Sequence, residues 1–133
     1  MINNSVTTSL YQRALDGVWQ RQRAIANNIA NYETPGYKAL KVSFEGALEQ
    51  EIKKLQSSMA SSDKKALDLH ALENSKIHVY KDQFTSERAD GNNVNLDYEN
   101  LEMAKTQIQY QYLTRGVTDT FARLRYAISE GKK

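Results

Sequence analysis

Two histidines and one asparagine-rich loop are the features of this 133-residue chain that could hold a metal ion. His70 and His78 lack the i, i+4 helical spacing of paired zinc ligands, and the chain contains no cysteine. The loop DGNNVNLD, residues 90–97, begins like a calcium-binding loop. Val94 and Leu101, however, stand where such a loop needs an oxygen ligand and a closing glutamate. Neither feature predicts a metal site.

The chain also lacks the patterns of an enzyme or a nucleic-acid-binding protein. No serine, histidine and aspartate stand out as a nucleophilic triad, and the six glycines form no phosphate-binding loop. The 18 basic and 16 acidic side chains are evenly spread, with a net charge of +2, so no region has the basic density that nucleic acids require. We therefore predict a protein that is not an enzyme, binds no cofactor and has no nucleic-acid partner.

The chain carries no visible membrane signal. Its beginning, MINNSVTTSL, has neither the basic nor the apolar region of a secretory signal peptide. No apolar run approaches the ~20 residues that a membrane helix needs. The sequence thus predicts no cleaved signal peptide and no direct membrane span.

A long N-terminal helix is predicted from residue 7 to about residue 31. A narrow stripe of apolar side chains recurs at helical spacing: Leu10, Ala14, Val18 and Ile25. A stripe this narrow suits the seam of a coiled coil better than the face of a globular core.

The sequence ANNIANYETPGYK, residues 26–38, ends this helix. Thr34 precedes the only proline of the chain and is therefore pushed out of the helical region. Pro35 and Gly36 are the favoured central pair of a type II turn, with Gly36 at the position of positive φ. Asn31 is expected to close the helix in the left-handed conformation.

The middle segment, residues 38–90, is predicted to hold a short amphipathic helix at about 43–59, with Ser43 as its N-cap. Residues 57–65 are small and polar and indicate a flexible linker. KIHVYK, residues 76–81, alternates in a way that hints at one short strand. Because an isolated strand is not stable, it either needs a partner from another subunit or is simply extended chain.

A second long helix is predicted from Asp97, taken as its N-cap, to about residue 129. One step of five at Gly116 implies a register shift. The apolar positions are Leu101, Ala104, Ile108 and Tyr112 before that step, at spacings of three, four and four, and Val117, Phe121, Leu124 and Ile128 after it, at spacings of four, three and four.

The expected fold is mainly α. Residues 1–37 and 91–133 form a discontinuous domain of two long helices paired as a coiled coil, and residues 38–90 form a small irregular segment. Periodicity does not identify what covers the outer helix faces. An ordinary small helical bundle and an assembling coiled coil therefore stay open as alternatives.

Two motifs, taken together, resemble a known family. ANNIANYETPGYK and FTSERADGNNVNLDYENL, residues 84–101, are similar to the helix-end motif and the DGN-V segment of bacterial flagellar rod, hook and hook-associated axial proteins. The short chain and sparse middle segment fit the proximal rod proteins better than the longer distal rod or hook proteins. Tyr32 and Glu33 depart from the family pattern, in which small or polar residues are commoner.

The resemblance implies a structural subunit of the proximal rod, which assembles helically in the periplasm and transmits torque. Its implied partners are copies of itself, other rod proteins, the adaptor between rod and MS ring, and the flagellar type III export apparatus. Export would then need no cleaved signal peptide, and the free chain would be disordered. A soluble helical adaptor or a flagellar export chaperone is the alternative.

The resemblance also implies which residues matter for assembly. They are the ones that match the two motifs: Asn27, Asn28, Ile29, Ala30, Asn31, Thr34, Pro35, Gly36, Tyr37, Asp90, Gly91, Asn92, Asn93 and Val94. Asparagine side chains can bond exposed backbone groups or a neighbouring subunit. The sequence leaves open which of these two roles dominates.

Overall fold

The computed structural model describes residues 2–60, 72, 74–84 and 88–130. It is mainly helical, as expected. The elements in chain order are α1 (Ile2–Ala30), β1 (Leu40–Ser43), α2 (Glu45–Ala60), β2 (His78–Lys81) and α4 (Leu96–Glu130). In the described ranges, no helix is long and apolar enough to cross a membrane.

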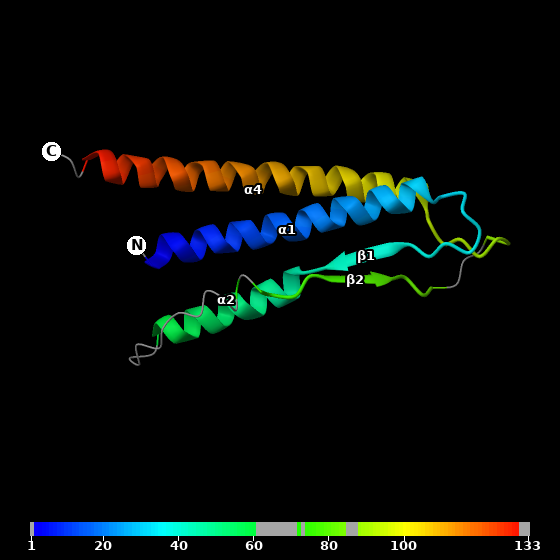
Figure 1. Cartoon of the computed structure of the whole chain (residues 1–133), viewed down its shortest axis with the longest axis horizontal. Coiled ribbons are helices and arrows are strands. Elements are labelled where there is room, and N and C mark those ends of the chain that lie inside the picture. Colours follow the sequence, from blue (N-terminus) through cyan, green and yellow to red (C-terminus); the bar gives the residue numbers. More distant parts are fainter. Residues whose placement is uncertain (1, 61–71, 73, 85–87, 131–133) are drawn as a thin grey trace.

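The helices and the small sheet form layers around α1. Helix α4 lies antiparallel to α1 on one side, and the sheet with α2 lies on the other (Figure 1). The start of α1 and the end of α4 are therefore at the same end of the molecule (Figure 1). Both loops that carry the asparagine motifs are at the opposite end.

Helix α1 begins earlier than predicted and ends differently. It starts at Ile2 because neither proline nor glycine interrupts the sequence before residue 7. The prediction of a left-handed Asn31 is wrong, since no described residue other than glycine has a positive φ. Instead, Asn31 Nδ2 donates to the Asn27 carbonyl at 2.8 Å and covers the end of the helix. Gly36 has φ 71°, which confirms the positive φ predicted for the turn.

The predicted short strand forms, but its partner lies in the same chain. β2 pairs antiparallel with β1, with Val79 opposite Val42. β1 is not predicted from the sequence, although Leu40, Val42 and Phe44 alternate with polar residues, because Ser43 is assigned there to a helix N-cap. That prediction is wrong: Ser43 belongs to β1, and α2 begins at Glu45.

The predicted linker falls partly on a helix. Residues 57–60 are the last turn of α2, and residues 61–65 lie outside the described residues. Polar composition alone therefore misplaced the end of this helix, because serine costs only a little more than alanine in a helix.

A small core joins α1 to β1 and α2. Val18, Ala24, Val42 and Phe44 are buried there, and α4 adds the partly buried Leu113. The ring of Phe44 packs directly on Gly17, where a Cβ atom would overlap it. Glycine at this position thus lets the strand and the helix approach closely.

Helix α4 presents a different face to α1 than its apolar pattern predicted. Its buried residues are Glu99 and Thr106, one heptad apart, and Leu113 follows one heptad later. The helix runs unbroken through Gly116, so the predicted register shift does not occur. Gly116 instead leaves room for the ring of Tyr11 on α1.

The N-cap of α4 is Asn95 rather than Asp97. Asn95 Oδ1 accepts a hydrogen bond from the Tyr98 N–H at 3.1 Å, which is the geometry of a cap that bonds the third helical residue. Asp97 instead lies in the first turn, where its charge favours the helix dipole.

Candidate functional site: the junction of two loops

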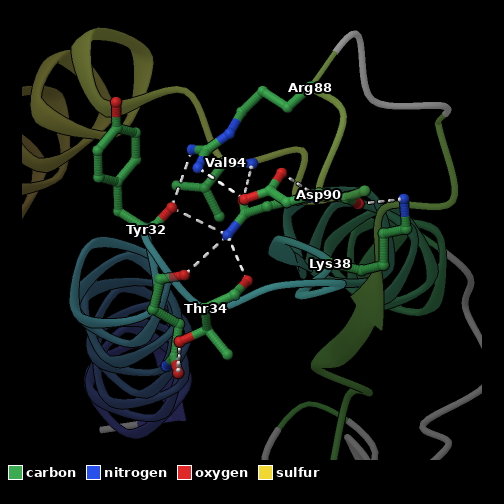
Figure 2. Close-up of polar contacts among 9 residues, drawn as sticks. Tyr32, Thr34, Lys38, Arg88, Asp90 and Val94 are labelled. Carbon is green, nitrogen blue, oxygen red and sulfur yellow. Dashed lines mark hydrogen bonds and ion pairs between the residues drawn. The ribbon is translucent and has the colours of Figure 1, made fainter.

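The two asparagine-rich motifs meet at the end of α1. Figure 2 shows the polar contacts that join them. Asn31 and Asn92, which bond one another across this meeting point, are 61 positions apart in sequence. We call residues 28–39 together with residues 88–94 the loop junction.

Asn92 lies at the centre of the loop junction and is completely buried. Its Nδ2 atom donates to three carbonyls, those of Asn31 and Tyr32 at 2.9 Å and of Thr34 at 2.8 Å. These carbonyls belong to the end of α1 and the turn after it, which have no helical partners of their own. The second loop therefore caps the first helix.

Hydrogen bonds within residues 90–94 orient the Asn92 side chain toward the end of α1. Asp90 Oδ1 accepts from the Asn92 N–H at 3.1 Å, and Asn92 Oδ1 accepts from the Val94 N–H at 2.8 Å. These are consecutive Asx turns, in which a short side chain bonds the backbone two residues on. Gly91 lies between them with φ 76°. The Gly36 N–H donates to the Asp90 carbonyl at 2.8 Å and joins the two loops directly.

Arg88 links the two loops at the edge of the loop junction. Its guanidinium donates to the Tyr32 carbonyl and pairs with Asp90 Oδ2, both at 2.9 Å (Figure 2). It also lies over the Tyr32 ring, 4.8 Å from the centroid, within range of a cation–π interaction. Tyr32 is one of the two residues that depart from the family pattern, and its aromatic ring thus has a partner in the same chain.

Asn28 joins α1 to the sheet and is also completely buried. Its Oδ1 accepts from the Leu40 N–H at 2.7 Å, and its Nδ2 donates to the Leu40 carbonyl at 2.8 Å. One side-chain amide thereby imitates the peptide group of a neighbouring strand. The Tyr37 hydroxyl donates to the same Oδ1 at 3.2 Å.

Asn93 also bonds backbone groups with both atoms of its side-chain amide, at the same end of the sheet. Its Oδ1 accepts from the Ala39 N–H at 2.7 Å, and its Nδ2 donates to the Asp82 carbonyl at 2.9 Å. The amide is therefore inserted between the ends of the two strands. Together, Asn28, Asn92 and Asn93 satisfy backbone groups that no regular element satisfies.

Two carboxyls, Asp90 in the loop junction and Glu99 beside it on α4, have shifted pKa values. The Asn92 N–H that donates to Asp90, with help from Arg88, lowers the pKa of the Asp90 carboxyl. Burial raises the pKa of the Glu99 carboxyl, although a hydrogen bond from Asn28 opposes this effect. Glu99 is only 4% exposed, so an ionised carboxylate there is costly at neutral pH.

Glu99→Gln is therefore expected to stabilise the chain at neutral pH by about 1 kcal/mol, or a few degrees in Tm. Glutamine keeps an oxygen for Asn28 without the buried charge. Because the folded pKa of Glu99 is raised, its penalty disappears as the pH falls through that pKa. Thermal unfolding of both chains across pH checks this: the advantage of the variant should vanish in acid. A variant less stable at every pH would contradict the assignment.

The structure brings together most, though not all, of the motif residues. Direct hydrogen bonds of the loop junction involve Asn28, Asn31, Thr34, Gly36, Tyr37, Asp90, Gly91, Asn92, Asn93 and Val94. Asn27, Ala30 and Pro35 are exposed, and Ile29 is half-buried. Sequence reasoning missed Arg88 and Glu99, because nothing local distinguishes them from other charged residues.

The predicted helix-seam residues divide into two groups. On α1, Ala14, Val18 and Ile25 are buried and Leu10 is half-buried. On α4, Leu101, Ile108, Phe121 and Ile128 are 49–59% exposed, Ala104 is exposed, and Val117 and Leu124 are half-buried. The exposed members do not form a seam with α1 in the single chain. Their packing against other subunits stays a prediction.

The loop junction offers no chemistry of its own. Among the described residues, no group of histidine, cysteine, aspartate and glutamate could hold a metal ion. Every buried side-chain nitrogen or oxygen in that part of the chain has a hydrogen-bond partner. The arrangement is that of a structural joint.

Comparison with known proteins agrees with a structural role. A family model described as "Flagella basal body rod protein" matches residues 12–38. The flagellar basal body rod protein FlgB of Bacillus subtilis (strain 168) is 36% identical over 128 residues, which cover 96% of this chain and 97% of the relative. FlgB of Borreliella burgdorferi is 36% identical over 77% of this chain and 80% of its own length. FlgB of Escherichia coli (strain K12) is 31% identical over 75% and 76%. The chain belongs to the FlgB family of flagellar basal body rod proteins and is a structural subunit of the rod.

Proposed function

We propose that this rod subunit builds the proximal rod by packing helically against copies of itself and other rod proteins through the outer faces of α4. The observation that carries the proposal is that α4 exposes two apolar rows. One row holds Tyr98, Leu101, Ile108, Tyr112 and Tyr126, and the other holds Tyr110, Phe121 and Ile128. The rows lie on either side of the face that contacts α1.

Because α4 exposes an apolar row on each side of its contact with α1, we expect it to pack against a neighbouring subunit on both of these sides. Burying exposed apolar surface between subunits contributes about 25 cal/mol per Å² before the costs of association. An interface that joins different faces of successive copies extends into a helical tube unless it closes into a ring. A tube of this kind can transmit torque, because each subunit is held on several sides.

The finer details of the proposal follow from family membership. The chain would leave the cytoplasm through the flagellar type III export apparatus without a cleaved signal peptide, work in the periplasmic rod, and meet the adaptor between rod and MS ring. Residues 1–37 and 91–133 would form the helical domain that lines the tube, and residues 38–90 its outer segment. An adaptor or export chaperone would not need two apolar rows on one helix.

Ile108→Asp tests the proposal. Ile108 is 54% exposed, so aspartate should leave the folding of the single chain unchanged. In the rod, it should place an unpaired charge in a subunit interface, at a cost of several kcal/mol. In cells that lack their own subunit of this family, the variant should fail to restore swimming and be absent from purified basal bodies.

Gln111→Asp is the matched control, because Gln111 is exposed on α4 between the two rows. This control should assemble normally. If Ile108→Asp restores swimming as well as the unchanged chain does, the row containing Ile108 is not an interface.

A further inference from the structure

The outer edge of β2 has backbone groups that no described residue pairs. The Asp82 N–H donates to the Ala39 carbonyl at 2.7 Å, and the register continues from this pair along both strands. Hydrogen-bonded and non-bonded pairs alternate in an antiparallel ladder. The peptide groups of Leu40 and Val42 on β1, and of Val79 and Lys81 on β2, therefore point away from the partner strand.

Helix α1 closes the outer edge of β1. The Leu40 peptide groups are paired by Asn28, as described above. The Val42 carbonyl accepts from Arg21 at 3.1 Å. Two side chains of α1 thus take the place of a third strand on this edge.

Among the described residues, no side chain covers the outer edge of β2 in this way. In the part of the chain that the structure describes, the outward peptide groups of Val79 and Lys81 have no hydrogen-bond partner. All four residues of β2 are exposed, with Val79 and Tyr80 each at 50%. An open edge of this kind can pair with another extended chain.

An apolar groove continues from this edge. Tyr80 and Phe84 line it together with the residues between them. Phe84 is 79% exposed, the most exposed large hydrophobic side chain among the described residues. In strand addition, backbone bonds supply affinity and a pocket for an alternate side chain supplies specificity.

The charges beside the edge favour an acidic occupant. Lys76 and Lys81 flank it along the chain, and the nearby Asp82 carboxylate is already paired with Lys41. The open edge of a second copy would be β2 itself, with the same Lys76 and Lys81. A second copy would therefore bring like charges together, which opposes pairing of this chain with itself.

We infer that β2 binds an extended segment of a different protein by strand addition, and that this segment carries an apolar side chain flanked by acidic residues. The apolar side chain enters the groove at Tyr80 and Phe84, and the acidic ones, which point to the opposite face of the added strand, lie beside Lys81. This surface lies on the opposite side of α1 from α4 (Figure 1), so the inference does not depend on the proposed role of the α4 rows.

Peptide binding to the isotope-labelled full chain tests the inference. The probe is an acetylated and amidated peptide of about five residues in which glutamate alternates with valine, and its control carries lysine in place of glutamate. The glutamate peptide should shift the amide resonances of residues 78–81 and 84. The lysine peptide should bind at least about tenfold more weakly, because its charges repel the basic edge.

Two variants make the test specific. Val79→Pro removes an outward N–H, a change that an edge strand tolerates, and should weaken binding about fivefold to tenfold. Phe84→Ser changes an exposed side chain away from the β ladder and should also weaken binding. Equal affinity for both peptides, no shift in β2, or unchanged binding by both variants would overturn the inference. None of these readouts depends on rod assembly.

Discussion

Asn92→Asp is expected to separate the two loops and to lower the stability of the chain more than any other change of similar size. The substitution keeps the shape of the side chain but replaces the Nδ2 donor with an acceptor oxygen. Three carbonyls now within 2.9 Å of that donor would face a negative charge. The loss of a buried donor together with repulsion should cost about 3–5 kcal/mol, or about 10 °C or more in Tm.

Thermal unfolding of the full chain measures this effect, and rod assembly in complemented cells should fail in parallel. Asn100→Asp is the matched control, since it makes the same chemical change at an exposed position of α4. Asn92→Ala should fall between the two, because it removes the donor without adding charge. If Asn92→Asp unfolds at the temperature of the control, the second loop does not hold the end of α1.

The second large effect is expected for Asn28→Asp, which should loosen the sheet from α1. Aspartate can still accept from the Leu40 N–H but cannot donate to its carbonyl. It also places a second carboxylate beside the buried Glu99, to which Asn28 now donates. We expect a loss of about 3 kcal/mol at neutral pH.

This effect should depend on pH in a definite direction. Two adjacent carboxyls raise each other's pKa, so the penalty should shrink as the pH falls and they become protonated. Hydrogen exchange at the Leu40 amide reports the loosening directly. Asn27→Asp, at the neighbouring exposed position, should leave exchange of that amide unchanged. Equal exchange rates in both variants would mean that Asn28 does not hold the sheet.

The long helices and the turn were predictable because their signals are local. Helical spacing over many residues predicts α1 and α4, and the Pro35-Gly36 pair predicts the turn. The resemblance of the two loops to one family predicted that both contribute to assembly. It could not predict that Asn92 of one loop caps the helix of the other, because that contact joins distant parts of the chain.

The buried face of α4 was not predictable for a physical reason. Pattern reading assumes that the most apolar stripe is the buried one, but α4 buries Glu99 and Thr106 and exposes Leu101 and Ile108. A helix that packs against several neighbours carries several apolar rows. The sequence does not indicate which face of the helix packs within its own chain. β1 was missed for a different reason: its four residues carry a short alternating signal that a neighbouring helix pattern obscured.

A reconstruction of the assembled rod that traces this chain would test the central claim most directly. We predict that Leu101, Ile108 and Phe121 are buried against neighbouring subunits, while Asn92 keeps its three carbonyl contacts inside one chain. The claim would be contradicted if these three side chains faced solvent in the rod, or if Asn92 bonded a neighbouring subunit instead of the end of its own α1.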